Sequence, residues 1–145
     1  LHLMWRIPFT AGTLKAIGRT PGKQDLVAEV KTAGAAANIQ LEADRTNINA
    51  DGKDLSFITV TVLDENGTLV PHADNLINFT IKGPGKIAGV DNGNQTSHES
   101  FQANSRSAFN GMCLAVIQTS LSPGIIHLSA TSEGLQESTI EIQAK

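Results

Sequence analysis

Apolar and polar side chains alternate along most of this chain, in short runs separated by polar or glycine-containing segments. The run at 38–43 is typical, with Ile39, Leu41 and Ala43 on one side and polar residues on the other. A period of two residues predicts β-strands with one buried face, and no segment has the longer period of an amphipathic helix. The strands expected on this basis cover residues 4–9, 13–19, 25–31, 38–43, 57–63, 76–81, 87–90, 112–117, 124–132 and 135–143.

The runs between residues 35 and 145 number about seven and follow one another at the turn spacing of a β-sandwich. Turn-type residues such as Asp51-Gly52 lie between them. Antiparallel sheets with one face towards solvent explain the clean alternation. We therefore expect an all-β domain in which two antiparallel sheets enclose a common core.

The first 34 residues carry three runs of their own, which predict a three-strand β-meander. Pro8 cannot donate a ladder hydrogen bond, so the first strand should lie at an edge. A meander has one face to bury and needs a partner. We expect the face of Trp5, Ile7 and Phe9 to pack on the second domain or to pair with another copy, giving a homo-oligomer.

Small uncharged residues at 32–37 suggest a boundary, and we expect one unit at 1–34 and a domain at 35–145. The chain opens inside a strand-like pattern without Met. We take this as a sign that it is part of a longer protein.

Composition narrows the chemistry. A net charge of −3 gives no basic surplus for phosphates, so no nucleic-acid partner is expected. No apolar run approaches the roughly 20 residues that cross a bilayer, so we expect no membrane span. Cys113, the sole cysteine, lies in an apolar run and should be an inert core thiol. The histidines lack metal-ligand spacing, and we expect neither a metal nor a cofactor. They are His2, His72, His98 and His127.

A long polar loop at 91–107 is the best candidate contact site, because long irregular loops in compact domains are often functional. Its candidate residues are Asp91, Asn92, Asn94, His98, Glu99 and Arg106. The first three could orient sugar hydroxyls or a calcium ion, but we favour side chains that cap their own turn. For His98 we favour a turn-stabilising or interface role over acid–base catalysis.

Several motifs carry a resemblance. Trp5-Arg6-Ile7-Pro8-Phe9 and Gly12-Thr13-Leu14-Lys15-Ala16 resemble the end of the penultimate β-sandwich module of bacterial family 2 glycoside hydrolases of the β-galactosidase type. Three further motifs resemble the C-terminal module that follows it. They are Gly89-Val90-Asp91-Asn92-Gly93-Asn94, Ser97-His98-Glu99-Ser100-Phe101 and Ala108-Phe109-Asn110-Gly111. The second module also resembles invasin-type bacterial immunoglobulin-like domains.

The resemblance implies an immunoglobulin-like β-sandwich at 35–145, preceded by the C-terminal fragment of a neighbouring module at 1–34. In this family the catalytic glutamates belong to a separate (β/α)8 barrel, so no catalytic residue is expected here. The implied role is an accessory domain in carbohydrate degradation, with the other domains of the same polypeptide as partners. The implied location is periplasmic or extracellular. An independent carbohydrate-binding module, with an oligo- or polysaccharide partner, or an adhesin-like module is the alternative.

Overall fold

The computed structural model describes residues 3–145, and all of its regular elements are strands. No helix in this range could span a membrane. The chain divides into two compact units, Leu1–Thr32 and Ala33–Lys145, which are described separately. Of the sequence-based interpretations, only the one for His2 lies outside the described residues.

The first unit holds two antiparallel strands, β1 (Thr13–Gly18) and β2 (Leu26–Lys31), paired from Thr13↔Lys31 to Gly18↔Leu26. A turn joins them, and in it the Lys23 amide donates to the Thr20 carbonyl at 3.1 Å. The prediction of a further strand at 4–9, which would have been the first strand of the meander, is wrong. A strand needs ladder hydrogen bonds as well as alternation; Pro8 cannot donate one, and no described strand pairs with this segment.

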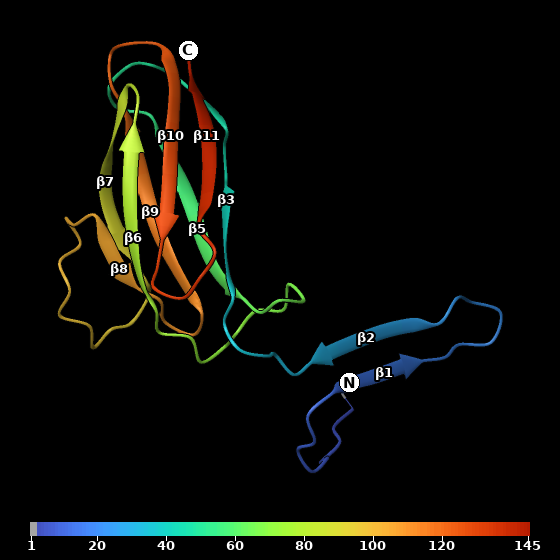
Figure 1. Ribbon diagram of the computed structural model, residues 1–145. Coiled ribbons are helices and arrows are strands. Elements are labelled where there is room, and N and C mark those ends of the chain that lie inside the picture. The colour runs from blue at the N-terminus through green and yellow to red at the C-terminus, as the bar shows by residue number, and fades with distance from the viewer. Residues whose placement is uncertain (1–2) are drawn as a thin grey trace. The chain divides into compact units, whose positions relative to one another are not determined.

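The second unit is the expected β-sandwich. Its strands are β3 (Asn38–Ala43), β4 (Asn47–Ile48), β5 (Leu55–Leu63), β6 (Leu76–Lys82), β7 (Gly85–Asp91), β8 (Ser105–Ser107), β9 (Met112–Thr119), β10 (Gly124–Thr131) and β11 (Ser138–Ala144). One sheet has the order β4-β11-β10-β6-β8 and the other β3-β5-β9-β7. Figure 1 shows them as two layers, with β6 and β10 in front of β5 and β9. Neighbouring strands are antiparallel except β4 and β11, which are parallel.

The core lies between the layers and contains the apolar residues that alternation predicted to face inwards. Ile58, Val60 and Val62 of β5 are fully buried. The opposite sheet contributes a matching set, which includes Ile77, Phe79, Ile126, Leu128 and Ile142. Cys113 is buried among them, and burial raises the pKa of its thiol to about 12. The expectation that Cys113 lies in the core is therefore confirmed, and a buried thiol with a raised pKa is a weak nucleophile.

Aspartate carboxylates of this unit accept hydrogen bonds from backbone amides in the segments between strands. The backbone amide of Asn49 donates to Asp54 at 2.8 Å and, with the Arg45 guanidinium at 2.9 Å, lowers the pKa of Asp54 to about 2. Asp64 is buried, and the amides of Gly34 and Thr68, each at 2.8 Å, lower its pKa. These carboxylates act as anchors for backbone amides.

Candidate functional site: the loop between β7 and β8

The loop begins with three side chains that cap the backbone immediately after them. Asp91 Oδ1 accepts hydrogen bonds from the amides of Asn92 at 2.7 Å and Gly93 at 3.2 Å. Asn92 Oδ1 accepts from the Asn94 amide at 3.0 Å, and Asn94 Oδ1 accepts from the Thr96 amide at 3.0 Å. This is the capping that we favoured from the sequence.

Arg106 lies at the centre of the site. It belongs to β8, is opposite Ile77 of β6, and its side chain is fully buried. Its guanidinium donates to Asn92 Oδ1 at 2.9 Å and to the Glu99 carbonyl at 3.1 Å. The guanidinium carbon is 5.2 Å from the centre of the Phe101 ring, which is a cation–π distance. The loop is thus folded around one buried cation.

Glu99 is the matching anion. Its carboxylate accepts hydrogen bonds from the Ser107 amide at 3.1 Å, the Ser107 hydroxyl at 2.9 Å and the Ser97 hydroxyl at 3.1 Å. Its Oε2 is 3.7 Å from Arg106 Nε, which makes no hydrogen bond to any described residue. Burial opposes ionisation of Glu99, but these donors and the Arg106 charge together lower its pKa. A carboxylate held in this way is a structural anion and a poor proton donor.

The structure therefore brings Asp91, Asn92, Glu99 and Arg106 together. Asn94 makes only local bonds to Thr96, and His98 is exposed and outside the described network. Sequence reasoning missed the contributions of Ser97, Ser107 and Phe101. Alternation gave no signal for them, because the sequence Ser105-Arg106-Ser107 contains no apolar residue.

Two hollows flank the loop. One, of about 250 Å³, is lined by Thr59, Asp91, Asn92, Gly93, Met112, Cys113 and Leu114. The other, of about 430 Å³, is lined by Lys86, Ile87, Ala88, Gln102, Ala103, Asn104 and Gln118. Glycoside hydrolysis normally uses two facing carboxylates. Neither lining contains two acidic side chains, and no group of three or more His, Cys, Asp or Glu within 3–145 could hold a metal.

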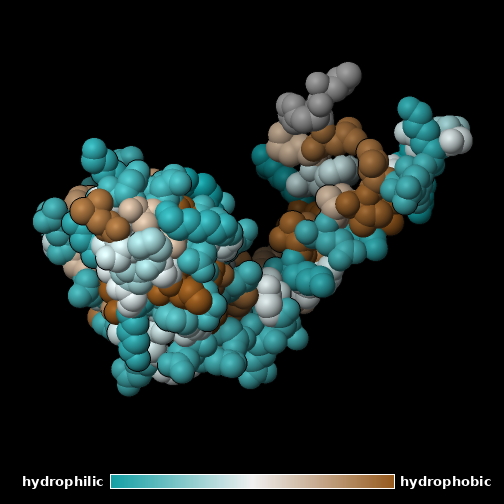
Figure 2. Space-filling view, turned by 90° about the horizontal axis from the view of Figure 1, so that it is seen from above, coloured by the Kyte–Doolittle hydropathy of each residue, from teal (hydrophilic) through white to brown (hydrophobic). Residues whose placement is uncertain are grey.

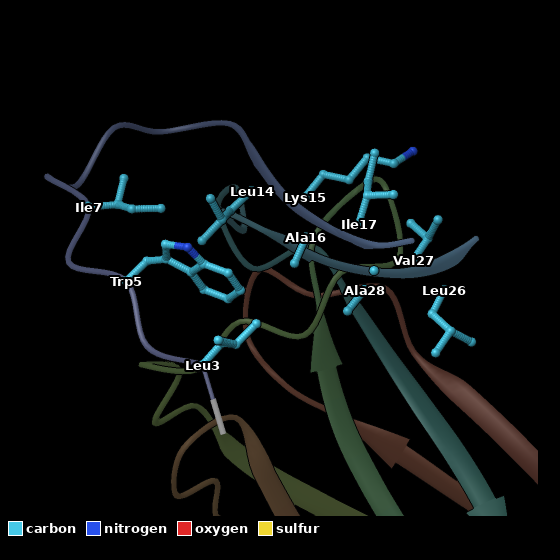
Figure 3. Close-up of a pocket in the computed structure, with 11 residues that line it drawn as sticks. Leu3, Trp5, Ile7, Leu14, Lys15, Ala16, Ile17, Leu26, Val27 and Ala28 are labelled. Atoms are coloured by element: carbon cyan, nitrogen blue, oxygen red, sulfur yellow. The ribbon is translucent and has the colours of Figure 1, made fainter. Parts of the chain in front are cut away.

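The first unit has a hollow of its own, of about 570 Å³, lined mainly by apolar side chains. In Figure 3 the Trp5 ring points towards Leu14 and Ala16 of β1, with Leu3 and Ile7 beside it. Trp5 and Leu26 stay largely exposed. The brown surface on this unit in Figure 2 reflects the same exposure. Such a surface suits contact with other apolar groups.

The fold and the loop together define an immunoglobulin-like β-sandwich domain whose polar loop is bonded to itself. Residues 39–141 match the family model described as glycoside hydrolase family 2 C-terminal domain 5, and the chain belongs to this family. The resemblance of the second module's motifs to the C-terminal domain of this family is thereby confirmed.

Individual relatives agree. The chain is 53% identical to beta-galactosidase BoGH2A of Bacteroides ovatus over all of its own length, which is 17% of that relative. The solved structure of a glycosyl hydrolase family 2 member from Bacteroides cellulosilyticus superposes on 97% of the chain with a TM-score of 0.92 and 40% identity. The matched part is 18% of that enzyme's chain. A C-terminal fragment of intimin superposes on 74% of the chain, and the matched part is 33% of that fragment. The TM-score is 0.52 at 22% identity, so this likeness shows the fold alone. The chain thus spans less than a fifth of the length of each of these two enzymes, which implies that such polypeptides contain further domains.

Proposed function

We propose that this chain is a non-catalytic accessory region of a family 2 glycoside hydrolase, and that it supports or positions the catalytic barrel of the same polypeptide. The observation that carries the proposal is that two ionisable groups of the loop, Glu99 and Arg106, are used in internal contacts. Glu99 and Arg106 bond to one another and to the loop. Groups satisfied in this way are not free to transfer protons or to attack a substrate.

The family also suggests an activity for the complete polypeptide. We propose that it hydrolyses O-glycosyl bonds in carbohydrate degradation, as a beta-galactosidase does, and acts in the periplasm or outside the cell. We further propose that residues 1–34 are the last part of a preceding β-sandwich module. The exposed apolar side chains of Trp5, Leu26 and Val30 support this, because they would be covered in a completed module.

The test is an activity assay on the purified chain. We expect no hydrolysis of an aryl β-galactoside above the buffer blank, whereas the complete polypeptide should turn it over. Deletion of this domain from the complete polypeptide should lower its thermal stability. Clear turnover by the chain alone would refute the accessory role.

One observation favours carbohydrate binding as a second candidate function. Phe101 is exposed on the loop, and the buried Arg106 guanidinium supports its ring. A fixed, exposed aromatic ring can stack on a sugar. Calorimetry with galacto-oligosaccharides should then show binding that Phe101→Ala abolishes and Phe109→Ala, a change at an exposed ring outside the loop, retains. Absence of binding to plant and mucin glycans would remove this candidate.

A further inference from the structure

The outward faces of the two sheets differ in chemistry. On the sheet that contains β10, the outward positions are mostly polar. Cross-strand neighbours there include His127 beside Glu141 and Lys82, and Ser129 beside Thr139 and Thr80. This is the usual chemistry of a sheet face in contact with water.

The other sheet has apolar side chains at the centre of its outward face, together with the uncharged polar side chains of Thr59, Thr61 and Gln118. Its central strands, β5 and β9, carry no ionisable side chain at any outward position. Phe57 is paired with Val116, and Thr59 with Leu114. We call this surface the β5–β9 face and define it by Leu55, Phe57, Met112, Leu114 and Val116. Phe57 and Met112 are each 41% exposed.

Charged residues surround this face only at its margins. Glu42 lies on the neighbouring strand β3, and Lys86 and Asp91 lie on β7. An apolar centre with a polar rim is the anatomy of a protein interface. The hollow of about 250 Å³ opens beside Met112 and Leu114, so the face has a recess as well as a flat part.

We propose that the β5–β9 face is the surface on which another domain of the same polypeptide packs. The inference rests on the accessory role proposed above and adds the surface that serves it. The chain is 17% of its Bacteroides ovatus relative, so more than four-fifths of such a polypeptide lies outside the described residues. A tethered neighbour is present at a high effective concentration, which favours it over a second copy. Because β5 and β9 present no ionisable side chain outwards, an unpaired charge on that neighbour would be costly to bury against them, which favours an uncharged contact surface.

Cysteine labelling tests the proposal with a low background. The buried Cys113, whose pKa is raised to about 12 by burial, should not react with a maleimide in the folded chain. Phe57→Cys and Met112→Cys place a thiol on the β5–β9 face. Leu76→Cys and Ile125→Cys are matched controls, because these residues are apolar, 48% and 45% exposed, and on the opposite sheet.

In the isolated chain all four variants should label at similar rates. In the complete polypeptide the two variants on the β5–β9 face should label at least about tenfold more slowly than in the isolated chain, while the two controls keep their rates. Labelling of the unsubstituted polypeptide is subtracted to correct for its other thiols. Continued silence of Cys113 verifies that each variant is folded. Equal labelling of all four in the complete polypeptide would overturn the proposal.

A second copy as the occupant is a distinct outcome. Protection of Phe57→Cys that grows with the concentration of the isolated chain, together with a dimeric mass, would overturn the proposed occupant. The labelling readout does not depend on activity. An accessory domain that packs through another surface would fail this test and still show no turnover, so the two proposals fail separately.

Discussion

The turn between β8 and β9 offers a sharp test of how backbone geometry specifies this sandwich. Phe109 and Met112 exchange two backbone hydrogen bonds around Asn110 and Gly111, whose φ angles are 52° and 77°. Two positive φ angles in succession define a primed hairpin turn, which favours Asn-Gly. A Cβ added at Gly111 would lie 2.3 Å from the Val70 carbonyl oxygen, so Gly111→Ala must displace backbone.

Gly67→Ala is the matched control. Gly67 has a φ of 76°, and an added Cβ there meets nothing within 4 Å. Left-handed strain of about 1–2 kcal/mol applies equally to both positions, as does the gain of about 0.4–1 kcal/mol from a stiffer unfolded chain. Only Gly111→Ala adds overpacking of about 1–3 kcal/mol. It also weakens the bonds that Gly111 makes with Val62 and Ala73, each contributing about 1 kcal/mol.

We therefore expect Gly111→Ala to lower the free energy of unfolding by about 3 kcal/mol more than Gly67→Ala does. Urea unfolding of both variants and of the unsubstituted chain measures this difference, and circular dichroism checks that each variant is folded. Equal losses for the two substitutions would show that positive φ alone limits these positions. In that case the close approach of Gly111 to Val70 would carry no energetic weight.

Three further outcomes are expected. Arg106→Ala should lower the free energy of unfolding in urea by about 3 kcal/mol or more, because it leaves buried acceptors and Glu99 without their cation. The control His98→Ala, at an exposed position, should change it by less than about 0.5 kcal/mol. Equal effects of the two substitutions would contradict the assigned network. The folded-state pKa of Asp54 lies below its ordinary value, so its contribution is present above about pH 4 and lost between about pH 4 and pH 2. The difference in Tm between the unsubstituted chain and Asp54→Asn should therefore narrow as the pH falls through that window. A difference that stays constant would refute the role of the carboxylate. Fluorescence of Trp5, the sole tryptophan, should be solvent-like and readily quenched in dilute chain, whereas a blue shift that grows with concentration would indicate pairing between copies.

Alternation predicted most strands because each has enough residues to show a period of two. In β5 the inward set of Ile58, Val60 and Val62 was evident from the sequence and is fully buried. Strand β8 has three residues, and β4 has two that pair in parallel with β11. Such short elements have no detectable period, and their existence depends on the neighbouring strand that tertiary folding supplies.

The candidate site shows the same division between local and distant information. Bonds made by Asp91, Asn92 and Asn94 reach only a few residues along the chain, so turn chemistry could predict them. Arg106 pairs with partners much earlier in the loop, and the sequence does not specify this choice. Its position is set by the β6–β8 register, which places it opposite the buried Ile77 and points it inwards. Only the assembled sheet makes the loop fold over this cation.

The apolar character of β9 links the sequence to the proposed interface. Met112 to Ile117 is an unbroken apolar run, within the strand that we expected at 112–117. Only Cys113, Ala115, Ile117 and Thr119 of β9 are fully buried in the sandwich core, while Met112, Leu114 and Val116 face outwards. Continuous apolar runs are typical of strands covered on both faces. The strand therefore has the composition of a doubly covered strand, although this domain covers one side, and a packed neighbour on the β5–β9 face would account for the other.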